Sequence, residues 1–353
     1  MQREPARTRG RPALAPRGRP TLATIAASAG VSVATVSKVV NGRDDVSAET
    51  RAAVEALLRA HDYNPPAARR TPAATTVEFL VHGDFGAYQT QIIDGVVAGG
   101  EEVGASVVVG KLVDGRPGTA PRAWARELAA AGRSGVVVVT GELSAAHVDA
   151  LEHARLPLVV IDPLNLPRRE VVSVGSTNFA GGMTATQHLL SLGHQRIAFA
   201  GGPAGSGCNQ ARLHGYRAAM EVAGLSVRPE HVLHDDFQFE SGRRLGERLL
   251  ALPDPPTAVV GACDTLALGV MEAARVRGLR VPDDLSITGF DDTELAGVST
   301  PPMTVIRQPL REMGRVAVRT LLRMAAGEEL DSHHVELATE LVVRGSTGPV
   351  PLR

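Results

Sequence analysis

The stretch from Thr21 to Pro66 constrains the fold most, because its pattern predicts three short helices packed around a small apolar core. Gly30 ends the first helix, and Ser32 can cap the second. A cap at Ser47 begins the third helix. The apolar positions that face inward are Leu22, Ile25, Ala26, Ala29, Val36, Val39, Val40, Val54, Leu57 and Leu58. Two helices joined by a tight turn that contains glycine predict a helix-turn-helix motif.

The second helix of this motif has a polar outer face. Ala34, Ser37, Lys38 and Asn41 lie opposite its apolar positions on a helical wheel. These side chains are short, apart from one cation, and such a face suits a helix that enters the major groove of DNA. The alternative is a three-helix fragment packed within another domain, which would leave the outer face unexplained.

The composition of the 353-residue chain allows two or three domains and predicts no membrane partner. Hydrophobic residues make up 44% of the chain, yet no apolar run approaches the ~20 residues that a membrane-spanning helix needs. The first residues are rich in arginine and lack the apolar segment of a secretory signal. Cys208 and Cys263 have no CxxC spacing, so zinc is not expected, and low cysteine content fits a reducing cytoplasm.

The basic character is concentrated in residues 1–20, because the formal net charge of the whole chain is only −1. The sequence Arg-Gly-Arg-Pro occurs at 9–12 and again at 17–20. Proline and glycine throughout this segment predict an arm that is disordered on its own. Two interpretations stay open. The arm contacts the minor groove of DNA, as AT-hook peptides do, or it is a solvated tail that only steers by charge.

From Val77 onward, short apolar segments alternate with longer amphipathic segments. Val136–Val139 and Leu158–Ile161 are continuous apolar runs, which are typical of strands buried on both faces of a parallel sheet. The alternation restarts after Asn178 and continues to Phe290. Two such sets in one chain predict two doubly wound α/β lobes.

Several motifs recur in the order typical of one known family. In the helix-turn-helix they are Val31-Ser32-x-Ala34-Thr35-Val36-Ser37-x-Val39-x-Asn41 and Tyr63-x-Pro65. Further along they include Arg212-x-x-Gly215-Tyr216, Gly289-Phe290-Asp291 and Gln308-Pro309. These segments resemble the LacI/GalR (lactose-repressor) family of bacterial transcription regulators, and the resemblance covers residues 21 to about 347.

The resemblance implies an N-terminal all-α helix-turn-helix headpiece and a two-lobed, periplasmic-binding-protein-like effector domain built on doubly wound parallel sheets. The implied divisions are an arm at 1–20, a headpiece at 21–64, a hinge at 65–76 and the effector and dimerisation domain at 77–347. Lobe 1 should cover about 77–162 and 309–338, and lobe 2 about 163–307 and 340–347. Three strands should cross between the lobes, near Asp162, at Arg307-Gln308 and at Glu340–Arg344.

The hinge departs from the family pattern. It lacks the leucine that the family inserts into the minor groove, and Pro72 stands near its place. Arg69 and Arg70 can still contact phosphates. The resemblance also assigns base reading to Val33, Ala34 and Lys38, and phosphate contacts to Ser32, Thr35, Ser37 and Asn41. Val33 has an alternative place beneath the second helix.

For the effector, the resemblance implies a cleft in which Arg212 holds the ligand and Asp291 accepts its hydroxyl or amino hydrogens. The further implied contacts are Tyr88, Gln89, Cys208, Phe237 and Cys263. Alternatives stay open, because Arg212 and Asp291 can pair with each other and Tyr88 can belong to the core. Asp264 is expected to cap a helix, His188 and His194 to be structural, and a thiol sensor at Cys208 is a remote alternative.

Taken together, the resemblance implies a cytoplasmic repressor that binds near-palindromic operator DNA as a homodimer and responds to a small-molecule effector. A sugar or oligosaccharide is expected, with an aromatic acid or a purine as the alternative. No catalytic residue, metal or cofactor is expected. A solute-binding protein would lack the helix-turn-helix, and a nucleotide-dependent enzyme would carry GxxxxGK[ST] or GxGxxG, neither of which occurs.

Overall fold

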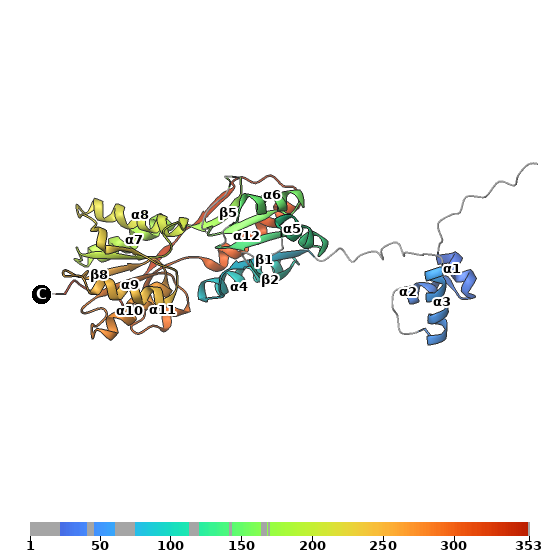
Figure 1. Cartoon of the computed structure of the whole chain (residues 1–353), viewed down its shortest axis with the longest axis horizontal. Helices are drawn as coiled ribbons and strands as arrows, with labels where there is room; N and C mark the ends of the chain where they lie inside the picture. The colour runs from blue at the N-terminus through green and yellow to red at the C-terminus, as the bar shows by residue number, and fades with distance from the viewer. Residues whose placement is uncertain are drawn as a thin grey trace, which may run out of the picture. The chain divides into compact units, whose positions relative to one another are not determined.

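The chain forms two compact units, Met1–Ala73 and Ala74–Arg353, in a computed structural model (Figure 1). The structure describes residues 22–40, 46–60, 75–112, 120–140, 143–163, 168 and 170–351. The N-terminal arm, Asn41 and residues 65–74 of the predicted hinge, with Arg69 and Arg70, lie outside the described residues. The end of that hinge is corrected, because Thr76 already begins the first strand.

The first unit contains the three predicted helices, α1 (Leu22–Ala29), α2 (Val33–Val40) and α3 (Ala48–Ala60). Both predicted caps are confirmed. The Ser32 hydroxyl accepts a hydrogen bond from the Thr35 backbone N–H at 3.0 Å, and the Ser47 hydroxyl accepts one from Thr50 N–H at 3.3 Å. The core is confirmed where side chains are described, and its buried members are Ile25, Ala26, Val36, Val39 and Val54. The side chain of Val40, which was also expected there, lies outside the described residues.

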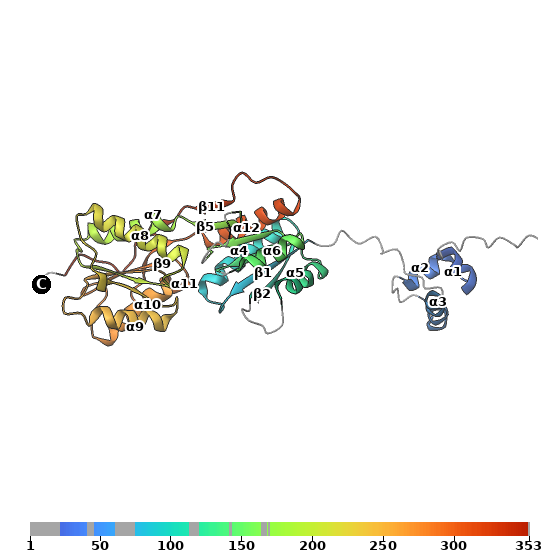
Figure 2. The ribbon, with the colours of Figure 1, turned by 45° about the horizontal axis from the view of Figure 1, so that its top comes forward.

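The second unit contains two six-stranded sheets, which confirms the predicted pair of lobes (Figures 1 and 2). The first sheet has the order β11-β5-β4-β3-β1-β2, and all its neighbours run parallel. Its strands are β1 (Thr76–His82), β2 (Ser106–Leu112), β3 (Gly135–Val139), β4 (Leu158–Ile161), β5 (Val172–Ser176) and β11 (His334–Leu337). Its helices are α4 (Ala87–Glu102), α5 (Pro121–Ala130), α6 (Ala145–His153) and α12 (Leu310–Ala325).

The second sheet has the order β12-β10-β9-β8-β6-β7. Only β12 runs antiparallel to its neighbour, β10, within this sheet. The strands are β6 (Ile197–Gly201), β7 (Val232–His234), β8 (Ala258–Gly261), β9 (Ser286–Asp291), β10 (Thr304–Arg307) and β12 (Glu340–Val342). The helices are α7 (Asn178–Ser191), α8 (Gly207–Val222), η1 (Pro229–His231), α9 (Phe239–Leu250), α10 (Asp264–Val276) and α11 (Glu294–Val298).

The predicted lobe boundary at Asp162 is wrong by one strand. β5 belongs to the first sheet, where Val159 of β4 pairs with Val172. The chain therefore enters the second lobe at Thr177, between β5 and α7. It returns after β10 and crosses again between β11 and β12, where the Thr339 N–H donates to the Thr177 hydroxyl at 3.0 Å. The boundary lies later than predicted because β5 pairs with β4 on one side and with β11, from near the C-terminus, on the other.

Helix α4 packs against α12 through glycines that allow the two backbones to touch. A Cβ placed on Gly95 would lie 2.0 Å from the Arg311 carbonyl oxygen. The close approach therefore requires glycine, and it fixes α4 on the face of the first sheet.

We expect Gly95→Ala to lower the free energy of unfolding by about 1–3 kcal/mol, because the added methyl group overpacks the α4–α12 contact. The matched control is Gly297→Ala on α11, where an added Cβ meets nothing within 4 Å. That change should leave stability unchanged or slightly raised. Urea unfolding of both variants measures the difference, and equal stabilities for the two would contradict this account of the packing.

Candidate functional site

The outer face of α2 is exposed as predicted from its pattern. Val33, Ala34 and Lys38 are exposed, whereas Thr35 and Ser37 are half-buried. The alternative place of Val33 beneath the helix is wrong, because its side chain is 46% exposed. The face thus presents two small apolar side chains and one ammonium group, which can contact a thymine methyl and a guanine edge.

In the second unit a cavity of about 470 Å³ lies between the two lobes. Its walls come from the loops that follow the carboxyl ends of parallel strands, where ligands of doubly wound sheets bind. All of the residues expected to contact an effector line it, namely Tyr88, Gln89, Cys208, Arg212, Phe237, Cys263 and Asp291. The structure thus brings together residues that are more than two hundred positions apart in the sequence.

Other residues that line the cavity were not predicted from the sequence, and they include Thr140, Asp162, Asp236 and Thr265. The sequence indicated Asp162 only as a possible crossing point. It directly follows the buried strand β4, just as Asp291 ends β9. A carboxylate at the end of an apolar strand was therefore the signal that could have identified it.

Arg212 is the buried centre of the site, with a side chain that is 4% exposed. Its Nε donates to Asn178 Oδ1 at 2.7 Å, and its Nη1 donates to the Ala262 carbonyl at 2.5 Å. The guanidinium also lies 3.8 Å from the centre of the Phe290 ring. These contacts fix the orientation of the guanidinium and leave Nη2 able to donate to a ligand.

Asp291 lies beside this guanidinium, with 3.7 Å between Oδ1 and Nη1 of Arg212. The pairing considered from the sequence therefore exists, but both groups also line the cavity. Gln308 holds the carboxylate, because its Nε2 donates to Asp291 Oδ1 at 2.6 Å, while the Ser176 hydroxyl donates to Gln308 Oε1 at 2.5 Å. Burial raises the pKa of Asp291 to about 7, against the opposing effects of Arg212 and Gln308.

A second buried carboxylate comes from the first lobe. The Tyr88 hydroxyl donates to Asp162 Oδ2 at 2.6 Å, so Tyr88 is more than core packing. Burial raises the pKa of Asp162, whereas the charge of Arg212 lowers it. Arg212 therefore acts electrostatically on one aspartate from each lobe.

Backbone strain is concentrated around this cavity. Thr140, Asp162 and Asp291 have φ values of 49°, 42° and 114°, and all three line it. Asp292, the next residue, has φ of 59°. Non-glycine residues rarely occupy this region, and such residues are found preferentially at binding sites and switch segments.

Both cysteines line the cavity. The Cys208 Sγ is 3.1 Å from the Ser206 hydroxyl, and Cys263 caps α10 by accepting from the Leu266 N–H at 3.5 Å. Burial raises the pKa of both thiols, which disfavours the reactive thiolate. The cap expected at Asp264 is wrong, because its Oδ2 instead accepts from the N–H and hydroxyl of Thr293.

The structure assigns His188 and His194 structural roles, as predicted. The His194 ring bonds the Thr257 hydroxyl at 2.9 Å and the Ser286 hydroxyl at 3.0 Å. His188 Nε2 lies 2.9 Å from the Thr347 hydroxyl. In the part of the chain that the structure describes, no cluster of three or more His, Cys, Asp or Glu side chains could hold a metal.

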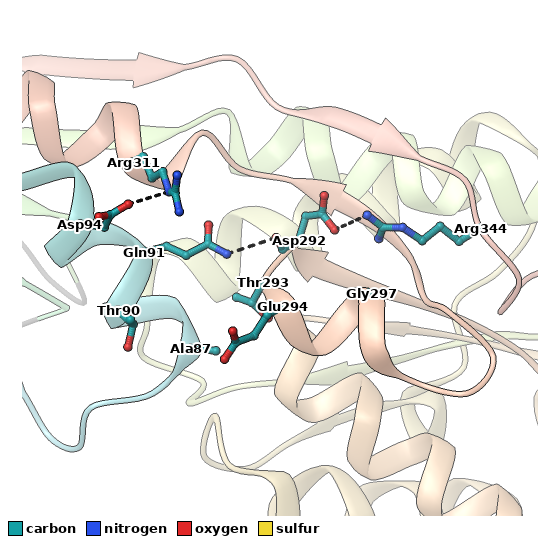
Figure 3. Close-up of a pocket in the computed structure, with 10 residues that line it drawn as sticks. All are labelled: Ala87, Thr90, Gln91, Asp94, Asp292, Thr293, Glu294, Gly297, Arg311 and Arg344. Atoms are coloured by element: carbon teal, nitrogen blue, oxygen red, sulfur yellow. Dashed lines mark hydrogen bonds and ion pairs between the residues drawn. The ribbon is translucent and has the colours of Figure 1, made fainter. Parts of the chain in front are cut away.

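A second cavity of about 550 Å³ lies elsewhere along the boundary between the two lobes, which we call the seam (Figure 3). In the first lobe, Arg311 Nε pairs with Asp94 at 2.9 Å. In the second lobe, Asp292 receives Arg344 Nη2 at 2.7 Å and Arg307 Nε at 2.6 Å. Gln91 Nε2 donates across the seam to the Asp292 carbonyl at 3.4 Å. Asp292 thus lines this second cavity, whereas the preceding residue, Asp291, lines the first.

Among the described helices, no single one is long and apolar enough to cross a membrane. The bent pair α1 and α2 passes that test by length and composition only, and both helices belong to the three-helix headpiece.

The raised pKa of Asp291 predicts a pH-dependent effect of Asp291→Asn. The folded protein binds this proton more tightly than the unfolded chain, so the group costs stability as pH rises from about 4 to about 7. Relative to the wild type, the Asn variant should become more stable across this range, by at most about 1.4 kcal/mol per pH unit.

Urea unfolding at several pH values measures the difference in stability between the two proteins. Both contain the same histidines, so the effect of histidine titration cancels in this difference. Asp236→Asn, at an exposed position of the same cavity, is the control. A difference that is independent of pH would refute the assignment of Asp291 as a carboxyl group with a raised pKa.

Comparison with known proteins extends over both units. Residues 21–66 match the model of bacterial regulatory proteins of the lacI family, and residues 186–347 match a periplasmic binding protein-like domain. The transcriptional regulator CelR of Thermobifida fusca is 34% identical over 339 residues, which cover 94% of this chain and 99% of CelR. The repressor CytR of Escherichia coli K12 is 32% identical, covering 94% and 97%.

Solved structures agree with these relatives. A complex of the regulator CelR with cellobiose has a TM-score of 0.70 at 35% identity, covering 93% of this chain and all of that one. The lac repressor dimer bound to operator and the anti-inducer ONPF has a TM-score of 0.70 at 29% identity, with 94% of this chain covered. These relatives are transcription regulators rather than enzymes. The chain belongs to the LacI family of bacterial transcriptional regulators.

Proposed function

We propose that this protein is a repressor that binds a near-palindromic operator as a homodimer. Its affinity for the operator falls or rises when an effector occupies the cavity between its lobes. The observation that carries the proposal is that one chain combines an exposed α2 face with a polar cavity lined by both lobes. Such a regulator works in the cytoplasm, where the bacterial chromosome lies.

In this proposal, Val33, Ala34 and Lys38 read bases, while Ser32, Thr35, Ser37 and Asn41 contact phosphates, together with Arg69 and Arg70 of the hinge. Exposure of the first three side chains supports their role. The Ser32 hydroxyl already accepts the Thr35 N–H, so its main contribution is to begin α2 at the correct residue. The beginning of α2 then presents backbone N–H groups, which bind phosphate well.

We propose a sugar or oligosaccharide as the effector. Arg212 Nη2 can donate to a hydroxyl, and the free lone pairs of Asp162 and Asp291 can accept from others. Phe237 supplies an apolar wall against which a sugar ring can pack. The cavity volume suits a molecule the size of a disaccharide, and the related regulator CelR binds cellobiose. An aromatic acid or a purine is the alternative, favoured only by Phe237.

The proposed response follows from the distribution of the contacts over two lobes. Tyr88 and Asp162 come from the first lobe, and Arg212 and Asp291 come from the second. A ligand that bonds all four stabilises one degree of closure, and DNA affinity shifts by the differential affinity of the effector for the two states. The Gln91–Asp292 contact at the neighbouring cavity would transmit the change in closure to α4, the helix that carries Gln91.

Lys38→Ala should reduce the discrimination between base pairs at one position of each half-site by roughly 1–3 kcal/mol, because a bidentate donor to guanine is lost. Gel-shift titration against operators substituted one position at a time measures this. Lys111→Ala, on β2 of the second unit, is a control for the loss of one lysine charge. An equal loss on every operator variant would show that Lys38 contacts only phosphate.

Phe237→Ala should weaken effector affinity about ten-fold, because an aromatic wall of the cavity is removed. Thermal-shift screening of sugars identifies the ligand, and calorimetry with the strongest hit measures the loss. Phe179→Ala is the matched control, since Phe179 is 48% exposed on α7 and does not line the cavity. If Phe237→Ala binds the effector with unchanged affinity, this cavity is not the effector site.

A further inference from the structure

We infer that the cavity between the lobes selects its effector by charge, accepting neutral or cationic hydroxyl-rich molecules and rejecting their anionic counterparts, such as sugar acids and sugar phosphates. The inference rests on the proposed function, because it concerns the same cavity and defines the chemical class that the cavity admits.

The first observation is the imbalance of charged side chains in the cavity wall. Among the described residues that line the cavity, Arg212 is the only arginine or lysine and His82 is the only other basic side chain. The carboxylates that line the same cavity are Asp84, Asp162, Asp236 and Asp291. An incoming anion therefore meets more negative than positive groups, and such like-charge contacts discriminate strongly between partners.

The second observation is that the charge of Arg212 is already compensated. Its guanidinium lies 3.7 Å from the Asp291 carboxylate and acts electrostatically on Asp162 as well. Two of its nitrogens are bonded to Asn178 and to the Ala262 carbonyl. Arginines that bind phosphate or carboxylate ligands usually present a free pair of donors. Here Nε and one hydrogen of Nη1 already bond the protein, so the pair of donors that would bind an anion is partly occupied.

The third observation concerns the buried acceptors. Asp162 accepts the Tyr88 hydroxyl, and Asp291 accepts the Gln308 amide, but each carboxylate has further lone pairs. These lone pairs accept hydrogen bonds from ligand hydroxyl or ammonium groups. A ligand carboxylate or phosphate brings negative charge without compensating donors. Burial raises the pKa of both aspartates, and the charge of Arg212 lowers it, so the same guanidinium already stabilises two carboxylates.

Nearby cations do not reverse the balance. Pairing with Lys111 compensates Asp84, but Asp162, Asp236 and Asp291 still outnumber Arg212 in the wall. Lys111 Nζ lies 2.9 Å from Asp84 Oδ1 at the cavity wall. Arg244 Nη2 lies 2.7 Å from Asp235 Oδ2, next to the lining residue Asp236. These pairs leave no excess of positive charge in the wall.

Cys208 allows the charge selection to be measured without knowledge of the effector. Its half-buried thiol lines the cavity, and Cys208 and Cys263 fall in separate tryptic peptides. The full-length protein is treated with two methanethiosulfonate reagents, a cationic ethyltrimethylammonium and an anionic ethylsulfonate. Mass spectrometry of unreduced peptides gives the rate at which each modifies Cys208. The same ratio in the urea-unfolded chain corrects for intrinsic reactivity.

We expect the corrected ratio of cationic to anionic rates to exceed one by about ten-fold, and Asp162→Asn to reduce it several-fold. Asp149→Asn, which changes a half-buried aspartate on α6 outside the cavity, is the matched control and should leave the ratio unchanged. A corrected ratio at or below one in the wild type would overturn the inference.

A ligand comparison completes the test. Cellobiose and its aldonic acid are compared for protection of Cys208 from a neutral thiol reagent. Protection by cellobiose but not by the acid supports the inference, and equal protection by the acid overturns it. If neither protects, cellobiose is not the effector and the reagent ratio alone decides the charge selection. Operator binding in a gel shift reports separately on the proposed function.

Discussion

The buried guanidinium of Arg212 is the interaction on which the arrangement of the second unit depends. It connects α8 to α7 through Asn178, to β8 through the Ala262 carbonyl and to β9 through Asp291 and the Phe290 ring. A charge this deeply buried is tolerated only when carboxylates and hydrogen bonds surround it. The same requirement places two aspartates at the cavity, so that the conditions for folding also supply the polar groups that a ligand needs.

The headpiece could be predicted almost completely from the sequence, whereas the lobes could be predicted only in outline. The caps at Ser32 and Ser47 and the buried Val36 and Val54 depend on contacts a few residues apart. β5 was missed because serine and glycine interrupt its apolar residues, and its place depends on pairing with β11, far along the chain. No local pattern contains that pairing.

The candidate site shows the same division. The resemblance supplied Arg212 and Asp291, and the structure gathered all the expected lining residues in one cavity. Asp162 and Asp236 were not predicted as lining residues, because neither belongs to a motif that carried the resemblance. Their place in the wall depends on which loops of the two lobes meet at the cavity. The cap was placed at Asp264 instead of Cys263, since a thiol is an uncommon cap and only the extended backbone at Cys263 reveals it.

The adjacent aspartates at the end of β9 have a consequence for how the two cavities are related. Asp291 lines one cavity and Asp292 the other, and both backbones adopt positive φ. A single planar peptide unit therefore joins a residue that lines one cavity to a residue that lines the other. A change of backbone conformation at this peptide unit would therefore alter the lining of both cavities at once.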